Sequence, residues 1–445
     1  MSHEELAEQL VKTCLKKGAD AAEVYIQDSR NLRISVRNGE IETIQESAGA
    51  GAGFRVFVKG KMAFSSSNDL RPESLDGAVL RAVEFAGITT ADPNNALPGD
   101  RGTTPVGGLH DPGISAVPME DKIVLAIKTE KLAMSSDPRI TKSGGASYGE
   151  GESDVFLANS NGLLKGYKTS TCAFGVSVVA EKGEQKAQGY ESCSRRFFSD
   201  LKPAEDVAAK AARDAFEMLD PRQVRTQKAA VIIAPDAARS LLGGVLAAVD
   251  GERVLQGASF LGKKAGLRIG SELITLIDDG TLEKGPASAP FDAEGVPTQK
   301  RVIVDKGILR GFLYNTAAAR RAGAQSTGNA SRSDFSSLPG IGPHNFFLQA
   351  GNVDPADIIH ATKTGFLVRE ITGYGINPVN GDFSGGASGL WIEEGRIAFP
   401  VKGLTIAGAA AEMLEGIDMV GNDLDSSRQI TAPTFRIRMM QIGGE

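Results

Sequence analysis

Histidine is the first residue type to consider for metal chemistry, and the chain of 445 residues holds four of them. They are His3, His110, His344 and His360, and no two have the i, i+4 spacing that places two imidazoles on one helix face. A catalytic zinc ion needs three protein ligands and an open position. The histidines therefore supply no local zinc motif, and we interpret His344 and His360 as loop or surface residues with satisfied ring nitrogens.

A serine nucleophile is conceivable at Ser384, two residues after Asp382 in the segment Gly-Asp-Phe-Ser-Gly-Gly. No histidine lies near Ser384 in the sequence. Aspartate and serine beside glycines are usually turn residues that bond their own backbone. We therefore interpret this segment as a turn, and a serine–lysine pair stays open as an alternative.

A pair of carboxylates, Asp292 and Glu294, lies between Pro290 and Pro297. In a strand, two residues at i and i+2 face the same side, and such a pair suits metal binding or acid–base catalysis. The flanking prolines favour a polar edge or a loop instead, and we favour that interpretation.

Phosphate and nucleic-acid chemistry are not indicated. Gly49, Gly51 and Gly53 have the wrong spacing for a dinucleotide loop, and strand-like residues follow them where a helix would be needed. The 55 acidic and 49 basic residues give a net charge of -6, which argues against a nucleic-acid partner held by charge.

The start of the chain and its cysteines predict a cytoplasmic protein without a membrane segment. The first ten residues are acidic and amphipathic, whereas a secretory signal begins basic and then becomes apolar. Apolar runs such as residues 241–249 are too short to cross a bilayer. Cys14, Cys172 and Cys193 form no C-x-x-C pair, and an odd count suits a reducing compartment.

The elements that must position these residues change character near Asp220-Pro221. Before that point, a capped helix from Ser2, hairpin turns at Asn38-Gly39 and Asn161-Gly162, and further helices give the order helix, strands, helix twice over. This order indicates a loose duplication. Beyond it, a buried strand, a helix over residues 235–249 and then mostly strands are expected. We predict an α+β protein of two domains: a mixed α/β domain over residues 1–222 and a domain dominated by antiparallel strands over residues 223–445.

Several motifs in the second half occur in a fixed order and carry a family resemblance. They are residues 259–263 (Ser-Phe-Leu-Gly-Lys), 276–280 (Leu-Ile-Asp-Asp-Gly), 290–299 (Pro-Phe-Asp-Ala-Glu-Gly-Val-Pro-Thr-Gln), 326–330 (Ser-Thr-Gly-Asn-Ala), and 381–384 followed by 389–393. Together they resemble the TldD/TldE (PmbA) family of metalloprotease-like proteins, also labelled modulators of DNA gyrase. The opening helix and the Arg-Asn-Gly-Glu hairpin at residues 37–40 are similar to the first domain of that family.

In the catalytic branch of the family, a helix carries H-E-x-x-x-H and a cysteine near the C-terminus completes the zinc site. Here the corresponding positions are Leu242, Gly243 and Ala247, and residues 425–428 (Asp-Ser-Ser-Arg) contain no cysteine. The resemblance therefore implies the TldE branch, with no metal, no cofactor and no catalytic residue in this chain, and with zinc expected in a partner subunit.

Such a chain is expected to pair with a TldD-like sister as a heterodimer, or with itself as a homodimer, and to act on peptides and partly unfolded proteins. The candidate substrate or partner groove comprises Asp292, Glu294, Ser326, Thr327, Asn329, Asp382 and Ser384. Two alternatives stay open: an autonomous hydrolase with an unrecognised site, and a protein-binding regulator of DNA gyrase. A sister with H-E-x-x-x-H encoded in the same genome would favour the heteromeric peptidase.

Overall fold

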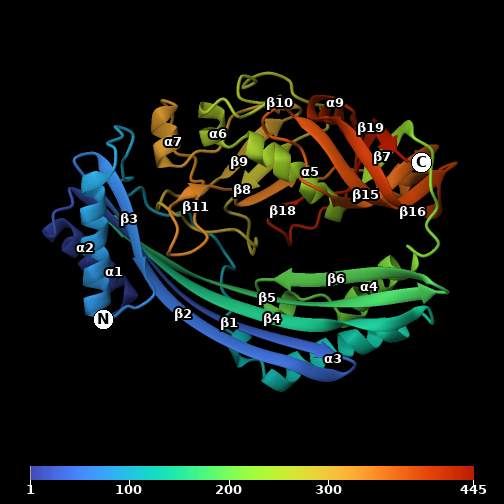
Figure 1. Ribbon diagram of the computed structural model, residues 1–445, viewed down its shortest axis with the longest axis horizontal. Helices are drawn as coiled ribbons and strands as arrows, with labels where there is room; N and C mark the ends of the chain where they lie inside the picture. Colours follow the sequence, from blue (N-terminus) through green and yellow to red (C-terminus); the bar gives the residue numbers. More distant parts are fainter. Residues whose placement is uncertain (1, 445) are drawn as a thin grey trace.

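The first half of the chain builds one long, curved, antiparallel sheet in the computed structural model, which describes residues 2–444 (Figure 1). Its order is β3-β2-β1-β4-β5-β6, so that two hairpin triplets meet at β1 and β4 and the predicted loose duplication is confirmed as a spatial arrangement. The strands are β1 (Ala21–Arg37), β2 (Glu40–Val58), β3 (Lys61–Ser67), β4 (Ile140–Asn159), β5 (Leu164–Lys182) and β6 (Gln185–Arg195).

The turns of this sheet follow the predicted chemistry. Asn38 and Gly39 join β1 to β2 with φ values of 55° and 78°, the left-handed pair that a two-residue hairpin requires. β2 runs unbroken from Glu40 to Val58, so Phe54 and Val56 belong to the same strand that begins after the Asn38-Gly39 turn.

Helices cover one face of the sheet in two groups. They are α1 (His3–Lys16), α2 (Pro72–Ile88), α3 (Met119–Ser135) and α4 (Ala204–Phe216), with short 3-10 turns η1 (Ile114–Ala116) and η2 (Phe198–Asp200). Even-numbered residues of β1 point to this face, so Val24 and Ile26 pack with α1 and α2 while Leu32 and Ile34 pack with α3 and α4. The odd-numbered residues, such as Tyr25, face the second half of the chain.

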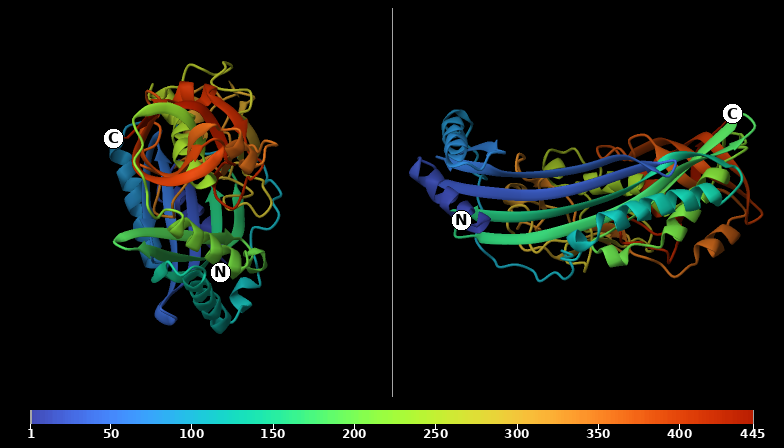
Figure 2. Two further views of the ribbon diagram at one scale, coloured as in Figure 1. Left: turned by 90° about the vertical axis from the view of Figure 1, so that its right-hand side faces the viewer. Right: turned by 90° about the horizontal axis from the view of Figure 1, so that it is seen from below.

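The second half lies over the concave side of the sheet (Figures 1 and 2). It contains a six-stranded sheet of order β16-β15-β14-β7-β19-β17, a five-stranded sheet of order β10-β9-β8-β13-β18 and the pair β11-β12. Most neighbours are antiparallel, as predicted, and the parallel exceptions are β14–β7 and β13–β18.

The strands of the second half are β7 (Gln227–Ile233), β8 (Leu276–Asp279), β9 (Lys300–Asp305), β10 (Ile308–Leu309), β11 (Ala330–Ser331), β12 (Gly340–Ile341), β13 (Asn345–Leu348), β14 (Thr364–Thr372), β15 (Asp382–Glu393), β16 (Arg396–Ala409), β17 (Ile417–Val420), β18 (Ile430–Thr431) and β19 (Phe435–Gly443). Its helices are α5 (Pro235–Ala248), α6 (Gly251–Leu255), α7 (Thr316–Arg321), α8 (Pro355–His360) and α9 (Ala410–Glu415). The fold is thus α+β, and the domain boundary at residue 222 stays a prediction. Among the helices of residues 2–444, none is long and apolar enough to cross a bilayer.

Candidate functional site

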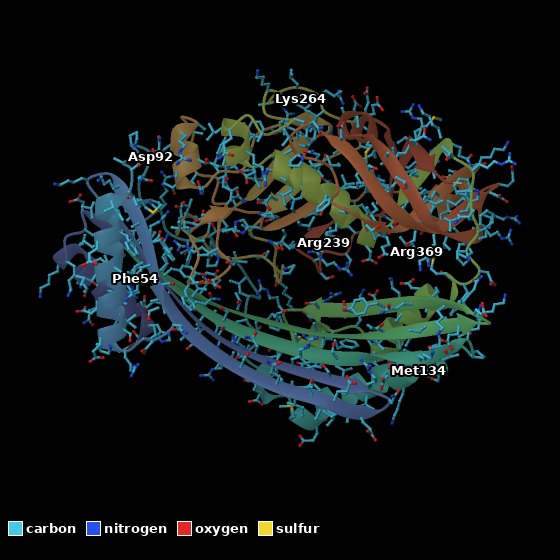
Figure 3. The ribbon with its side chains drawn as sticks, viewed as in Figure 1. Phe54, Asp92, Met134, Arg239, Lys264 and Arg369 are labelled. Carbon is cyan, nitrogen blue, oxygen red and sulfur yellow. The ribbon has the colours of Figure 1, made fainter. Side chains whose placement is uncertain are left out.

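Helix α5 carries the positions at which the resemblance implies a metal motif. Pro235 starts it, where its missing N–H costs nothing, and Asp236 suits the positive end of the helix dipole. One side packs into the core, and its buried residues are Ala237, Ala238, Leu241, Leu242, Gly244, Val245 and Ala248. Arg239 is exposed on the side of the second half that faces the long sheet (Figure 3).

The three positions of the implied motif do not point in one direction. Leu242 is 6% exposed and packs in the core of the second half. Gly243 and Ala247 lie one helical turn apart and share the outer face, because i and i+4 are neighbours on a helix. A Cβ built on Gly243 would meet nothing within 4 Å. A close backbone approach occurs instead at Gly244, whose Cβ would lie 2.5 Å from the Ile376 carbonyl oxygen.

Truncation of Leu242 tests whether this side of α5 is core. We expect Leu242→Ala to lower the free energy of unfolding by about 2–5 kcal/mol, because it removes buried methyl groups and leaves a cavity. Urea denaturation measures the loss, and Leu255→Ala, at a position 40% exposed in α6, serves as the control. Equal stability of the two variants would contradict the core assignment.

Ion pairs occupy the segment in which the resemblance implies a cysteine. The Asp425 carboxylate lies 3.2 Å from Lys202 Nζ and 3.8 Å from Arg195 Nη2, both in the first half of the chain. Arg428 Nη1 lies 2.6 Å from Asp236 Oδ1 at the start of α5. This segment therefore joins α5 to the long sheet through charges, where the catalytic branch would present a thiolate.

The cysteines lie elsewhere and are chemically quiet. Cys14, Cys172 and Cys193 are all buried, and burial raises the pKa of Cys14 and of Cys172 to about 12. Thiols with such values stay protonated at neutral pH and are poor nucleophiles and metal ligands. Across residues 2–444, no group of three or more His, Cys, Asp or Glu side chains is arranged to hold a metal ion. That the chain binds no zinc stays a prediction.

Asp292 and Glu294 lie in a buried turn, so the strand alternative is wrong, and the favoured loop is closed to solvent. Asp292 Oδ1 accepts hydrogen bonds from the backbone N–H groups of Glu294 and Val296 at 2.9 and 3.0 Å. Its Oδ2 accepts one from Ala330 at 2.9 Å. Burial, and then the charge of Glu294, raise the pKa of Asp292 to about 7. Asp292 thus organises the surrounding backbone and is almost fully buried, which leaves little room for a substrate to reach it.

Glu294 belongs to a buried charge network that joins the two halves of the chain. Arg55 in β2 donates to Glu294 Oε1 at 2.7 Å and to Glu23 Oε2 at 2.6 Å. Arg332 donates to the other oxygen of Glu23. Burial alone would raise the pKa of Glu294, but the charge of Arg55 and the hydrogen bond from the Thr316 backbone N–H outweigh it and lower the pKa. We call Glu23, Arg55, Glu294 and Arg332 the interdomain network.

Sequence analysis missed Arg55, Glu23 and Arg332, although two glycines give a signal for the contact. Gly51 and Gly53 lie on the same face of β2 as Arg55, because alternate residues of a strand point to the same side. A Cβ on Gly51 would lie 2.3 Å from the Phe335 ring, and one on Gly53 would lie 2.2 Å from the Phe335 carbonyl oxygen. The glycines therefore allow a loop of the second half to rest directly on the sheet.

The motif at residues 326–330 forms a second buried polar cluster. Thr327 donates to Asn329 Oδ1 at 2.7 Å and accepts from the Tyr314 N–H at 2.8 Å. Asn329 Nδ2 donates to Asp278 Oδ2 at 2.6 Å, and the half-buried Ser326 accepts from a neighbouring backbone N–H at 3.3 Å. These side chains satisfy one another and backbone groups, which is the usual role of buried polar residues.

The interpretations of the two histidines agree with the structure. His344 lies in a loop, with Nε2 2.7 Å from the Gly328 carbonyl oxygen, and it is buried. His360 is exposed at the end of α8, and its Nδ1 lies 3.9 Å from Asp357. Within the described residues, neither histidine belongs to a group of side chains that could hold a metal ion.

Asp382 and Ser384 lie apart from the buried clusters, exposed on β15, so the interpretation of this segment as a turn is wrong for both residues. Asp382 accepts from Asn380 Nδ2 at 2.6 Å, and Ser384 pairs with Ala407 of β16 in the sheet. Within the described residues, no hydrogen bond joins them to Asp292, Glu294 or residues 326–330. The seven candidate groove residues therefore do not line one open groove.

The chain also holds one sequence that fits the pattern of a serine nucleophile elbow. Residues 145–149 (Gly-Ala-Ser-Tyr-Gly) fit G-x-S-x-G, yet they lie inside strand β4. A nucleophile elbow needs a sharp turn from strand to helix, so Ser147 is a strand residue and not a nucleophile.

The fold and this α5 region define the class as a metallopeptidase-like protein. Comparison with known families agrees: "PmbA/TldA metallopeptidase domain 1" matches residues 22–86, the central domain matches 112–219 and the C-terminal domain matches 226–444. The chain belongs to the PmbA/TldD metallopeptidase family.

Individual relatives cover almost the whole chain. The metalloprotease PmbA of Escherichia coli O157:H7 is 32% identical over 99% of this chain and 96% of that protein. A PmbA homolog of Haemophilus influenzae is 29% identical over 98% and 94%. Among solved structures, TldE from Thermococcus kodakarensis is 25% identical with a TM-score of 0.89, covering 98% of this chain and 99% of that one. A Bacteroides thetaiotaomicron protein named as a candidate modulator of DNA gyrase is 25% identical with a TM-score of 0.91, covering 99% of both chains.

Proposed function

We propose that this chain is the non-catalytic, TldE-like subunit of a heteromeric peptidase that acts on peptides and partly unfolded proteins in the cytoplasm. The observation that carries the proposal is the α5 region. Leu242 is core, Gly243 and Ala247 offer no ligand atoms, and residues 425–428 hold ion pairs in place of a thiolate. A zinc peptidase needs its metal to generate a nucleophile near neutral pH and to polarise the scissile carbonyl.

Pairing with a metal-bearing sister supplies what this chain lacks. When a zinc ion is bound in the sister's H-E-x-x-x-H motif, it provides the activated water, and this chain contributes binding surface and enclosure. The solved TldE relative supports assignment to this branch. The autonomous-hydrolase alternative has weaker support, because Asp292 and Glu294 are buried and Ser384 has no base beside it.

The direct test compares the purified chain, an H-E-x-x-x-H sister from the same genome, and their mixture. We expect the chain alone to hold no stoichiometric zinc by elemental analysis and to cleave no peptides. The mixture should elute as a stable complex whose peptidase activity a chelator abolishes. One tightly bound zinc per molecule of this chain, or chelator-sensitive cleavage by the chain alone, would overturn the proposal.

The outer edge of β2 is a surface suited to such a partner. Residues 40–49 are exposed, and β3 pairs with β2 only from Ala52 to Val58. Within residues 2–444 the remaining edge has no strand beside it, and an open edge can accept a strand from another chain. Glu40 and Glu46 make this edge acidic, whereas Glu42 pairs with Arg37 at 3.1 Å. Two identical edges would bring like charges together, so we favour a heterodimer over a homodimer.

Charge reversal on this edge tests the surface. We expect Glu40→Lys with Glu46→Lys to weaken the complex by about tenfold or more, because rim charges set complementarity. A matched control, Glu184→Lys with Glu415→Lys, changes the net charge equally at exposed positions outside the edge. Titration of each variant with the sister measures the dissociation constant, and equal weakening by both pairs would show a general charge effect and refute the docking edge.

A further inference from the structure

A cleft of about 360 Å³ opens where the two halves of the chain meet beside α6 and α7. It is walled by β2 and β3, by α6 and α7, and by the loops around residues 95 and 340; the lining residues used below are Arg55, Phe57, Met62, Asp250, Asn315 and Leu338. In Figure 1 these elements lie at the end of the molecule that carries β3, away from residues 425–428. The volume falls at the lower end of small-molecule sites, which span about 300–1,000 Å³.

One wall offers an unused hydrogen-bond donor. Arg55 is 94% buried, being 6% exposed, and its two terminal nitrogens donate to Glu294 and Glu23. Its Nε has no partner among the described residues. The Nε is itself buried, and a buried N–H without an acceptor is costly, so an oxygen atom of a ligand that reached it would gain a hydrogen bond. Because Glu23 and Glu294 already balance the guanidinium, the cleft favours a carbonyl oxygen as much as an anion.

The opposite wall offers an unpaired carboxylate. Asp250 Oδ1 caps α6 by accepting from Glu252 N at 2.8 Å and Arg253 N at 3.2 Å. Its Oδ2 makes no hydrogen bond or ion pair with the described residues. The other carboxylate that lines the cleft, Glu252, is already paired, because its Oε2 lies 2.8 Å from Arg321 Nη1. Asp250 is therefore the lining carboxylate free to receive a cation.

Between these groups apolar side chains form part of the lining, and an ion pair holds the cleft in shape. Phe57, Met62 and Leu338 line it, and Asn315 donates only weakly, at 3.4 Å, to the Pro339 carbonyl oxygen. Asp92 sits beside α7 (Figure 3), where its carboxylate lies 2.7 Å from Arg321 Nη2. That ion pair ties the loop around residue 95 to α7.

We propose that this cleft binds the free amino terminus of a short peptide with an apolar first side chain. The α-ammonium pairs with Asp250 Oδ2, the first side chain packs on Phe57 and Met62, and the first carbonyl faces the Arg55 side chain. The site lies in this chain alone and outside the α5 region. It therefore does not rest on the proposed role in a heteromeric peptidase, and its failure would leave that role untouched.

Calorimetric titration of the full chain with two probes tests the site. Leu-Ala-amide carries a free ammonium group, and N-acetyl-Leu-Ala-amide lacks it. We expect the first to bind at least about tenfold more tightly, in line with a charge-assisted hydrogen bond. Asp250→Asn, which keeps a good helix cap, should bring the two affinities together.

A second experiment fills the cleft with a larger side chain and measures the binding of the same probe. Met62→Trp should abolish binding of Leu-Ala-amide, and Met439→Trp, at a position 60% exposed in β19, should not. If Met62→Trp fails to fold, Leu338→Trp on the other wall gives the same test. Undetectable binding to the wild-type chain, equal affinity for both probes, or unchanged binding after the cleft is filled would each overturn the proposal.

Discussion

Replacement of Arg55 by methionine should lower the free energy of unfolding at pH 7 by about 3–5 kcal/mol, the usual loss when one partner of a buried ion pair is removed. Arg55 is the cation between two buried carboxylates, and without it Glu294 keeps only the Thr316 N–H at 2.8 Å. Urea denaturation measures the change. Arg33→Met, at an exposed position of β1, removes a charge from the same sheet and should cost little.

The pH dependence of this variant has a defined sign. In the wild-type chain the pKa of Glu294 lies below its ordinary value, so Glu294 contributes stability that is present above pH 4.5 and lost as pH falls through the folded pKa. Without Arg55, burial dominates and the folded pKa rises above the unfolded one. The folded variant then binds the proton more tightly, and its deficit should shrink as pH falls from about 7 to about 5.

A double-mutant cycle keeps the result interpretable. Glu294→Gln added to Arg55→Met removes the unpaired charge, so the double variant should be more stable than the two single losses added together. Additive losses, or a loss no larger than that of Arg33→Met, would show that the interdomain network does not brace the two halves.

The parts of the fold that depend on neighbours in sequence were predictable. Asn38-Gly39 specifies a hairpin because both turn positions need positive φ, and Ser2 with Glu5 specifies a helix start. The length of β2 was not predictable in the same way. Its residues 40–49 are exposed, so no apolar alternation marks them as a strand, and their pairing with β1 is what makes them one.

The candidate site was less predictable, because its contacts are long-range. Arg55 and Glu294 are 239 residues apart, and neither local sequence indicates the other. The i, i+2 spacing of Asp292 and Glu294 marked a segment with buried polar contacts. The turn gives the two carboxylates different roles: Asp292 accepts hydrogen bonds from the backbone, and Glu294 pairs with Arg55. For α5, the implied motif positions could be named from the resemblance. The structure was needed to show which of these positions face the core. Leu242 is buried there, whereas a Cβ on Gly243 would meet no other atom within 4 Å.

The largest expected effect concerns which chain of the complex carries the catalytic groups. Replacing the glutamate of the sister's H-E-x-x-x-H motif by glutamine should lower the peptidase rate of the complex by about 10²–10⁴-fold, the usual contribution of a general base. Ser384→Ala or Asp382→Asn in this chain should leave kcat within about threefold, because a residue outside the transition state alters at most substrate affinity.

Rebuilding the motif here should not create an enzyme. In a Leu242→His, Gly243→Glu, Ala247→His variant, the first imidazole would point into the apolar core and the second would lie on the outer face of α5. No cysteine lies in residues 425–428, and Asp425 is already paired with Lys202. The variant would also lack the groups that orient metal-bound histidines. Peptide cleavage by the purified chain and by this variant, each assayed without the sister, measures the expectation. Hydrolysis by the wild-type chain alone, lost in Ser384→Ala, would establish an autonomous hydrolase and refute the subunit role.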